Sequence, residues 1–475
     1  MGLSVCTAAG QGLGSPPNNE GSRNTMFKST PKSKMVKVAA ATAALGSIAA
    51  IGLIGNSPAN ADPKQYAGLV TVGSDTTQDV MNGLAGHANG RNFTPVQSDA
   101  ASGLRQIVSF DATTPGGDPT IPECIITKTG GPAFERPNGS SAGRAALSRK
   151  IEGTPFEDKG RACGPVDVST SVDFARSSSA PSSTGTPPNQ LVYVPLGKDA
   201  LSFAYYDTSP GTGPGVVDTL TRAQLDDLFD GVGSDVVTIN GIRILPCGIQ
   251  TGSGTYQSWN GATTASVQQD DDATSTCRDF GLRGPDGLLP TDPGDAGDRI
   301  LDLNGRLQEH NAVQLKEIGD FAPVKAISDQ VIVGFSASQY IGRSNGLGNP
   351  APPADVFLGA ISNNQVDGTG INCGFPITSG GAPNASYYDN CAGFSRTVFN
   401  VFAWSTLFRD ADPVTPGIQE GPSFGNADVK SLFQGPTSSV CLEGARIQEF
   451  GYLPLTGAAC GTTTTRGPLV ANPAP

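Results

Sequence analysis

Residues 250–259 read QTGSGTYQSW, and the prediction of the fold rests mainly on this stretch. Its turn of small residues at 252–255 predicts the start of a helix, and residues 243–246 (RILP) before it predict a strand. A strand that passes through such a turn into a helix can bind an anion, because the first N–H groups of a helix have no internal partner. The alternative is an ordinary helix cap, in which the hydroxyl groups satisfy only their own helix.

Three further turns of small polar residues occur earlier in the chain. Residues 73–80 read GSDTTQDV after the apolar stretch 68–72, residues 139–147 read GSSAGRAAL, and residues 172–178 read VDFARSS. One such turn is most simply a cap. Four on one chain predict a site at which donor groups from several segments meet.

In this order, the four turns resemble those of the phosphate-binding proteins of ABC transporters, within the wider bacterial solute-binding superfamily. The likeness spans about residues 68–335. LVYVPLGKDALSF at 191–203 is similar to the strand that crosses between the two lobes of the family, and LTRAQLDDLFDG at 220–231 is similar to the helix after it. The turns and the resemblance together give these candidate ligand-binding residues: Ser74, Thr76, Thr77, Ser140, Ser141, Arg176, Ser177, Ser178, Gly252, Ser253, Gly254 and Thr255.

Two departures from the family pattern concern the ligand. Ser178 stands where the family has an aspartate that accepts the proton of hydrogen phosphate, and Ile249 stands where it has an arginine. A hydroxyl in place of the carboxylate removes the group by which the family distinguishes hydrogen phosphate from sulfate. Arg176 or Arg144 could supply the positive charge from another side of the binding pocket. Alternatively, both arginines could lie in solvent. The expected ligand is therefore an oxyanion, with its identity left open.

The resemblance implies an α/β, two-lobed fold of the periplasmic-binding-protein type (type II), in which each lobe is a mixed sheet flanked by helices and the ligand lies in the cleft between the lobes. A length of 475 residues suits two lobes. Lobe 1 is expected at 62–194 together with about 330–475, and lobe 2 at about 195–329. Residues 331–335 are expected to be the returning strand.

Residues 1–61 are expected to be an N-terminal extension and a signal peptide. Four lysines after Met26 precede an apolar run at 38–55, and PANA at 58–61 offers a cleavage site near Ala61. Cleavage is favoured over membrane anchoring, because the run consists largely of Ala and Gly and ends in an A-x-A site. The start could be Met1 or Met26. The mature protein is expected to be secreted or associated with the cell wall.

Eight cysteines follow the signal segment, and an even number in an exported protein predicts disulfide bonds. The expected pairs are neighbours along the chain: Cys124 with Cys163, Cys247 with Cys277, Cys373 with Cys391, and Cys441 with Cys460. A metal site is not predicted, because no C-x-x-C occurs and the histidines are His87 and His310. His310 is expected to make a hydrogen bond in a loop or hinge, and not to act as a general base.

These observations favour a binding protein over an enzyme. The net charge of −12 argues against a nucleic-acid partner or an anionic membrane. The main hypothesis is an extracellular, monomeric receptor that captures phosphate or a related anion for uptake or sensing, needs no cofactor, and works with an ABC permease or a membrane sensor. Two alternatives are a secreted wall or surface structural protein with the same fold and no ligand, and a secreted phosphoesterase.

Overall fold

The computed structural model describes residues 62–63, 68–99, 105–113, 123–158, 163–229, 236–250, 252–263, 307–366, 368–409, 420–421 and 423–473. Among them, no helix has the length and apolar character needed to cross a membrane. The apolar run at 38–55 and the expected cleavage site near Ala61 lie outside this part of the chain.

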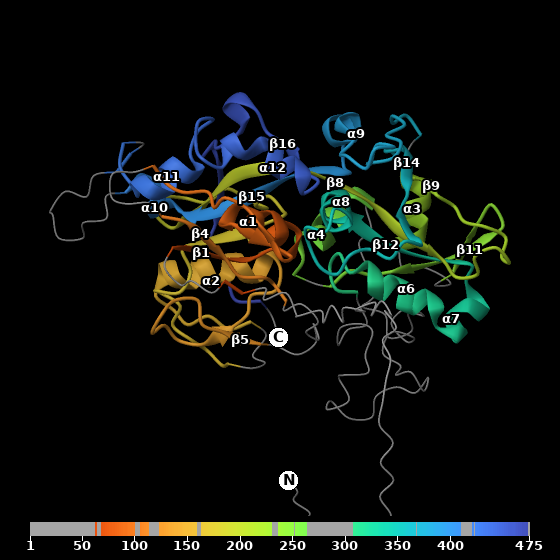
Figure 1. The fold of residues 1–475 in the computed structure, drawn as a ribbon, viewed down its shortest axis with the longest axis horizontal. Coiled ribbons are helices and arrows are strands. Elements are labelled where there is room, and N and C mark those ends of the chain that lie inside the picture. The colour runs from red at the N-terminus through yellow and green to blue at the C-terminus, as the bar shows by residue number, and fades with distance from the viewer. Residues whose placement is uncertain are drawn as a thin grey trace, which may run out of the picture. The chain divides into compact units, whose positions relative to one another are not determined.

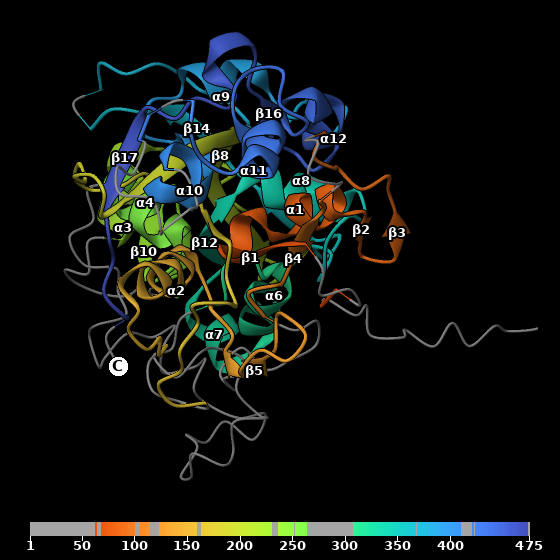
Figure 2. The ribbon, with the colours of Figure 1, turned by 90° about the vertical axis from the view of Figure 1, so that its left-hand side faces the viewer.

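One large mixed sheet forms the centre of the fold (Figures 1 and 2). Its strands follow the order β10 (Val237–Ile239), β11 (Ile242–Cys247), β12 (Gln330–Ser336), β8 (Gln190–Asp207), β15 (Ser395–Ala403), β7 (Phe174–Ser177), β1 (Leu69–Gly73) and β4 (Ile107–Ser109). Three short strands also pair with β8: β13 (Val356–Leu358), β16 (Leu453–Pro454) and β17 (Thr465–Pro468). The expected α/β class, with a mixed sheet flanked by helices, is confirmed.

Helices α1 (Gln78–Ala85) and α2 (Ser140–Glu152) cover opposite faces of β1 (Figure 1). Leu69 of β1 packs in one apolar cluster with Val80 of α1, whereas Val70 packs in another with Ala145 of α2. Successive side chains of a strand point to opposite faces, so one strand anchors both helices. Each helix begins directly after one of the predicted turns.

Strand β8 runs through both halves of the sheet. Its first half pairs antiparallel with β15, from Leu191 opposite Ala403 to Ala200 opposite Ser395. Its second half pairs antiparallel with β12, from Leu201 opposite Ser336 to Asp207 opposite Gln330. Most of its side chains are buried and many are Val, Leu, Phe or Tyr, which favour a central strand.

The chain returns to the first half of the sheet through β15. Residues 331–335, the expected returning strand, lie in β12, which pairs within the second half. After β12, strand β13 still pairs with the second half of β8, and β14 (Ala360–Asn363) pairs with β9 (Thr219–Thr221). The described residues from Asp62 onward belong to one compact unit. The division into lobes near residues 194 and 330 stays a prediction.

Trp259 fixes helix α4 (Gly254–Thr263), which carries the GSGT turn at its start. The ring is fully buried, meets Phe229 edge to face at a centroid distance of 5.5 Å, and lies against Gly334 of β12. A Cβ atom at position 334 would lie 2.6 Å from the ring, so only glycine allows the strand to come this close to Trp259. The start of α4 is therefore held against β12.

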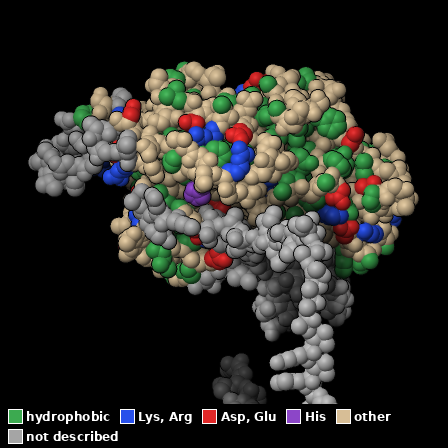
Figure 3. Space-filling view, in the orientation of Figure 1, with side chains coloured by type: hydrophobic (Ala, Val, Ile, Leu, Met, Phe, Trp, Pro, Cys, Tyr) green, Lys and Arg blue, Asp and Glu red, His purple; other side chains and the backbone are tan. Residues whose placement is uncertain are grey.

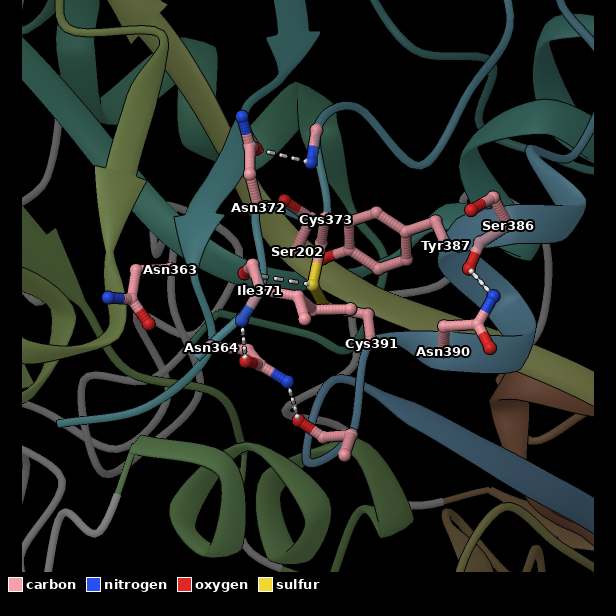
Figure 4. The surroundings of a disulfide bond; sticks show 12 residues. Ser202, Asn363, Asn364, Ile371, Asn372, Cys373, Ser386, Tyr387, Asn390 and Cys391 are labelled. Atoms are coloured by element: carbon pink, nitrogen blue, oxygen red, sulfur yellow. Dashed lines mark hydrogen bonds between the residues drawn. A yellow bond between two sulfur atoms is a disulfide. The ribbon is translucent and has the colours of Figure 1, made fainter. Parts of the chain in front are cut away.

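Three of the four expected disulfides are formed in the structure, namely Cys124–Cys163, Cys373–Cys391 and Cys441–Cys460. Cys247 is also disulfide-bonded, and its expected partner Cys277 lies outside the described residues. Figure 4 shows Asn364 beside the second pair, where it accepts a hydrogen bond from the Ile371 backbone and donates one to the carbonyl of Ala392. The side chain thereby links the two segments that the disulfide joins.

Candidate functional site

The turn at 252–255 packs directly on the turn at 139–141. The backbone N–H of Ser141 donates to the carbonyl of Gly252 at 3.2 Å. A Cβ atom at Gly254 would lie 2.2 Å from Ser178 Oγ and 2.6 Å from Ser140 Oγ, so only glycine allows this approach. Ser140 Oγ in turn accepts the backbone N–H of Ser178 at 3.0 Å. Three of the four predicted turns thus meet.

The fourth turn joins them through Thr76. Its Oγ1 lies 3.3 Å from Thr255 Oγ1, and both hydroxyls donate to Oε1 of Glu309, in the case of Thr76 at 2.5 Å. The backbone carbonyl of Thr76 accepts hydrogen bonds from Gln339 and Tyr452, which hold the turn in place. We call the group formed by Thr76, Thr255, Glu309, His310 and Arg396 the polar cluster.

His310 adds a third donor to the same carboxylate oxygen. The backbone N–H of Ser336 donates to Nδ1 at 3.4 Å, which assigns the proton of a neutral imidazole to Nε2. Nε2 lies 2.9 Å from Glu309 Oε1. His310 has a φ of +61°, a left-handed conformation that is strained for a residue with a side chain. The sequence-based expectation of a loop hydrogen bond for His310 agrees with this placement.

Glu309 is an anion held entirely inside the protein. Its side chain is fully buried, which by itself raises the pKa, but the hydrogen bond of His310, the charge of Arg396 and the hydrogen bond of Thr255 bring the pKa well below its ordinary value. The carboxylate is therefore ionised at neutral pH. Its second oxygen, Oε2, is buried and has no hydrogen-bond partner among the described residues.

Arg396 supplies the positive charge of the polar cluster. It stands opposite Asp199 in the β15–β8 ladder, and its Nε and Nη2 donate to Asp199 Oδ2 at 2.9 and 2.8 Å. Nη2 also donates to Thr255 Oγ1 at 2.6 Å. Asp199 Oδ1 accepts from the Ser336 hydroxyl at 2.6 Å and from the Ser338 backbone at 3.2 Å. A fully hydrogen-bonded aspartate thus fixes the guanidinium.

The two arginines that the sequence suggested do not touch the polar cluster. The guanidinium of Arg176 is fully buried and donates to the carbonyls of Ser74 and Gly73 and to Ser109 Oγ. Arg144, also buried, donates to the carbonyl of Ser140 and to Tyr193. Neither side chain lies in solvent. Each ties down the backbone of a turn that borders the site.

The remaining candidate residues fall into two groups. In the first group the hydroxyls have partners inside the protein. Ser253 accepts the backbone N–H groups of Thr255 and Tyr256 and so caps α4. Ser177 donates to the carbonyl of Ser179, and Ser141 accepts a hydrogen bond from Gln257. In contrast, the hydroxyls of Ser74 and Thr77 are buried without a hydrogen-bond partner in the described part of the chain. Two candidate donors beside Thr76 are therefore uncommitted.

A buried acidic group lies behind the Thr76 turn. Arg343 donates to the carbonyl of His310 and pairs with Asp75 and Asp79, each at 3.3 Å. Burial raises the pKa of Asp79 to about 6 against the opposing effect of Arg343. Burial, with the charge of Asp79, raises the pKa of nearby Asp111 to about 7. Arg343 thus joins the Glu309–His310 turn to the base of α1.

Sequence reasoning missed Glu309 and Arg396. A signal for Arg396 was present, because Asp199 interrupts a strongly apolar strand and a buried carboxylate needs a cationic partner. Glu309 had no comparable signal. Within the described residues, no group of three or more His, Cys, Asp or Glu side chains is arranged to hold a metal ion. Figure 3 shows acidic and basic side chains mixed over the visible face, without a large patch of one sign.

The described residues define a mixed α/β protein whose central sheet carries a buried cluster of donors around one carboxylate. No family model matches the chain, and no curated protein matches it.

Three solved structures show how far the likeness to known proteins extends. A phosphate binding protein from Stenotrophomonas maltophilia is 13% identical with a TM-score of 0.35, and the match covers 82% of this chain and 91% of that one. A human phosphate binding apolipoprotein is 14% identical with a TM-score of 0.37, over 82% and 92% of the two chains. PstS from Borrelia burgdorferi is 12% identical with a TM-score of 0.28, over 71% and 87%. With identities and TM-scores this low, the function of this chain must be inferred from its own residues.

Proposed function

We propose that this protein is an extracellular solute-binding protein that captures an oxyanion at the polar cluster. The observation that carries the proposal is the convergence of three donors, from Thr76, Thr255 and His310, on a single carboxylate oxygen. The Glu309 oxygen stands in for an oxygen of the ligand. Hydroxyl, imidazole and guanidinium donors in a buried site are the groups that bind phosphate or sulfate.

The donors come from parts of the chain that are far apart. Thr76 follows β1, Thr255 is the second residue of α4, and Arg396 is the second residue of β15, so the geometry depends on the whole fold and not on one local motif. A simple helix cap would need only its own turn, as Ser253 illustrates. The hydroxyl of Thr255 instead meets groups on three other segments. This difference supports a binding site over a structural cap.

The cellular part of the proposal follows from the sequence. The segment 26–61 has the features of an export signal with cleavage near Ala61. A secreted or wall-associated receptor of this kind would deliver its anion to an ABC permease or report it to a membrane sensor. We propose that it acts as a monomer and without a cofactor.

The proposal is tested with the mature chain, beginning at Asp62, after unfolding and refolding to remove any bound ion. Phosphate and sulfate are titrated by calorimetry and by thermal shift, with chloride at equal ionic strength as the control. Ligand at 100 times its Kd stabilises the folded state by about 2.7 kcal/mol. Failure of the wild type and of every variant of the polar cluster to bind either anion contradicts the proposal.

A structural surface protein without a ligand is the second candidate, because Glu309 already satisfies the donors from inside the chain. Native mass spectrometry separates the two, since a receptor retains an oxyanion after mild purification. The phosphoesterase alternative gains no support from His310. In a catalytic triad, one nitrogen of the histidine accepts the hydroxyl proton and the other nitrogen donates to a carboxylate. In this protein the same nitrogen, Nε2 of His310, contacts both threonine hydroxyls and Glu309.

A further inference from the structure

We infer that Glu309 is an internal occupant of the oxyanion position, so that an external anion binds only when the turn at 307–311 carries this side chain out of the polar cluster. The inference rests on the proposed function, because it assumes that the donors form a binding site. It adds a residue that sets the affinity of that site.

The first argument is that Glu309 already uses the hydrogen-bond donors of the polar cluster. Each Thr hydroxyl has one proton and the neutral imidazole has one N–H, and all three are directed to Glu309 Oε1. Nη2 of Arg396 is shared between Asp199 and Thr255. An anion that arrives while Glu309 is in place meets donors that are already used.

The second argument is charge. Arg396 is paired with Asp199, and Asp75 is close enough to Glu309 that each raises the energy of the other's ionised form. Glu309 stays ionised because the donors around it stabilise its charge. An external oxyanion would then add a further negative charge to a buried site that has no surplus of positive charge among its described residues. If the Glu309 carboxylate leaves the polar cluster as the anion enters, the net charge of the buried site stays the same.

The third argument is that the turn is held in a costly conformation. His310 has a φ of +61°, which only a few non-glycine residues adopt, and Glu309 Oε2 is buried without a partner among the described residues. The Arg343 side chain holds the turn through the carbonyl of His310, and Gln308 donates to Asp75 at 3.0 Å. Movement of the turn would release the strain at His310 and expose Oε2 to water.

Three unpaired buried groups belong to Arg396 and to the turn that carries Thr76. The hydroxyls of Ser74 and Thr77 and Nη1 of Arg396 are buried and lack hydrogen-bond partners in the part of the chain that the structure describes. Unpaired buried donors are unusual in a folded protein, and each is explained if a ligand satisfies it. Among the members of the polar cluster, Arg396 therefore has a buried N–H group that Glu309 does not satisfy.

Calorimetric titration of Glu309→Ala with inorganic phosphate and with sulfate tests the inference. We expect at least one of these anions to bind about tenfold more tightly than to the wild type, because the competing carboxylate is gone. Glu317→Ala is the matched control, since it removes an exposed carboxylate from the adjacent helix α6 (Ala312–Asp320) and should bind as the wild type does. Formate, which can replace the lost carboxylate, should raise the Tm of Glu309→Ala and leave that of the wild type unchanged.

Each other outcome is informative. Equal affinity in the wild type and Glu309→Ala overturns the inference and leaves the proposed function standing. Weaker binding in the variant also overturns it, since Glu309 would then contact the ligand. Absence of anion binding in both proteins contradicts the proposed function itself. If Glu309→Ala does not fold, Glu309→Gln keeps the shape without the charge, and an unchanged affinity in that variant overturns the inference.

Discussion

The hydroxyl oxygens of Thr76 and Thr255 lie 3.3 Å apart, although 179 positions separate the two residues in the chain. Thr76 belongs to the turn after β1, which pairs in the first half of the sheet. Thr255 lies in the first turn of α4, which packs on β12 in the second half. This contact brings the predicted turns of both halves to one place. Its side chains are therefore the first to test.

Thr255→Ala should weaken anion binding, and it should also lower the free energy of unfolding because the hydroxyl donates to the buried carboxylate of Glu309. A hydrogen bond to a charged group contributes about 1.5–3 kcal/mol, which corresponds to a loss of roughly tenfold to a hundredfold in Kd. Calorimetric titration measures the loss. Thr208→Ala is the matched control, because this buried hydroxyl donates to the carbonyl of Ser328 beyond the end of β8 and has no contact with the polar cluster. A similar loss of affinity in both variants would argue against a direct contact.

Arg396→Met should destabilise the protein strongly, because it leaves the buried carboxylate of Asp199 without its cation. Breaking a buried ion pair in this way costs about 3–5 kcal/mol. Urea denaturation measures the change in the free energy of unfolding. Addition of Asp199→Asn to the same chain should recover part of the loss, since the neutral amide needs no counterion. No recovery in the double variant would mean that Arg396 acts through packing.

Arg176→Met should also destabilise the protein, but by a different route. The carbonyls of Ser74 and Gly73 would lose their donor in a fully buried place, at a cost of about 1–3 kcal/mol for each unsatisfied group. Because the guanidinium does not contact the polar cluster, the salt dependence of anion binding should stay as in the wild type. A reduced salt dependence, measured by titration at several ionic strengths, would instead place Arg176 beside the ligand.

The stability of the protein should fall as the pH rises from about 4 to 7. Burial raises the pKa of Asp79 from 3.8 to about 6 and that of Asp111 from 3.8 to about 7, so the folded state holds more protons than the unfolded state in this window. The shift at Asp79 corresponds to roughly 3 kcal/mol. Asp111→Asn, whose amide oxygen can still accept from Asn82, should flatten the profile. Urea titrations at several pH values check both expectations, and a profile unchanged by Asp111→Asn would contradict them.

Peptide mapping of the unreduced mature protein should show a bond between Cys247 and Cys277. Cys247 is disulfide-bonded, and the three other neighbouring pairs are formed. The Cys247–Cys277 bridge should stabilise the fold by about 2–4 kcal/mol, because it restricts the unfolded chain. A free thiol at Cys277 in an alkylation assay would exclude this pair.

The parts of the fold that depend on local sequence could be predicted. Glycine, serine and threonine at the four turns mark helix starts and strand ends, and the neighbouring cysteines at 373 and 391 are close enough to bond without help from distant segments. The resemblance implied that the four turns would meet at one site, whereas the contact between Thr76 and Thr255 was not itself predicted. Its role in ligand binding stays a prediction.

The parts that depend on distant pairing could not be predicted. Arg396 reaches the polar cluster because the register of β15 places it opposite Asp199, and register between strands almost 200 residues apart has no local signal. Glu309 enters through a turn whose left-handed residue is a histidine and not the expected glycine. The pairing of β15 with the first half of β8 likewise has no local signal, and the expected division into lobes stays a prediction.

Strand β8 changes partners between Ala200 and Leu201, which lie opposite Ser395 at the start of β15 and Ser336 at the end of β12. Asp199 stands at this junction and bonds to side chains from both partners, Ser336 and Arg396. The first half of β8 packs in one hydrophobic core and its second half in another. A single uninterrupted strand, with Asp199 at the change of partner, therefore connects both cores to the polar cluster without a separate linker.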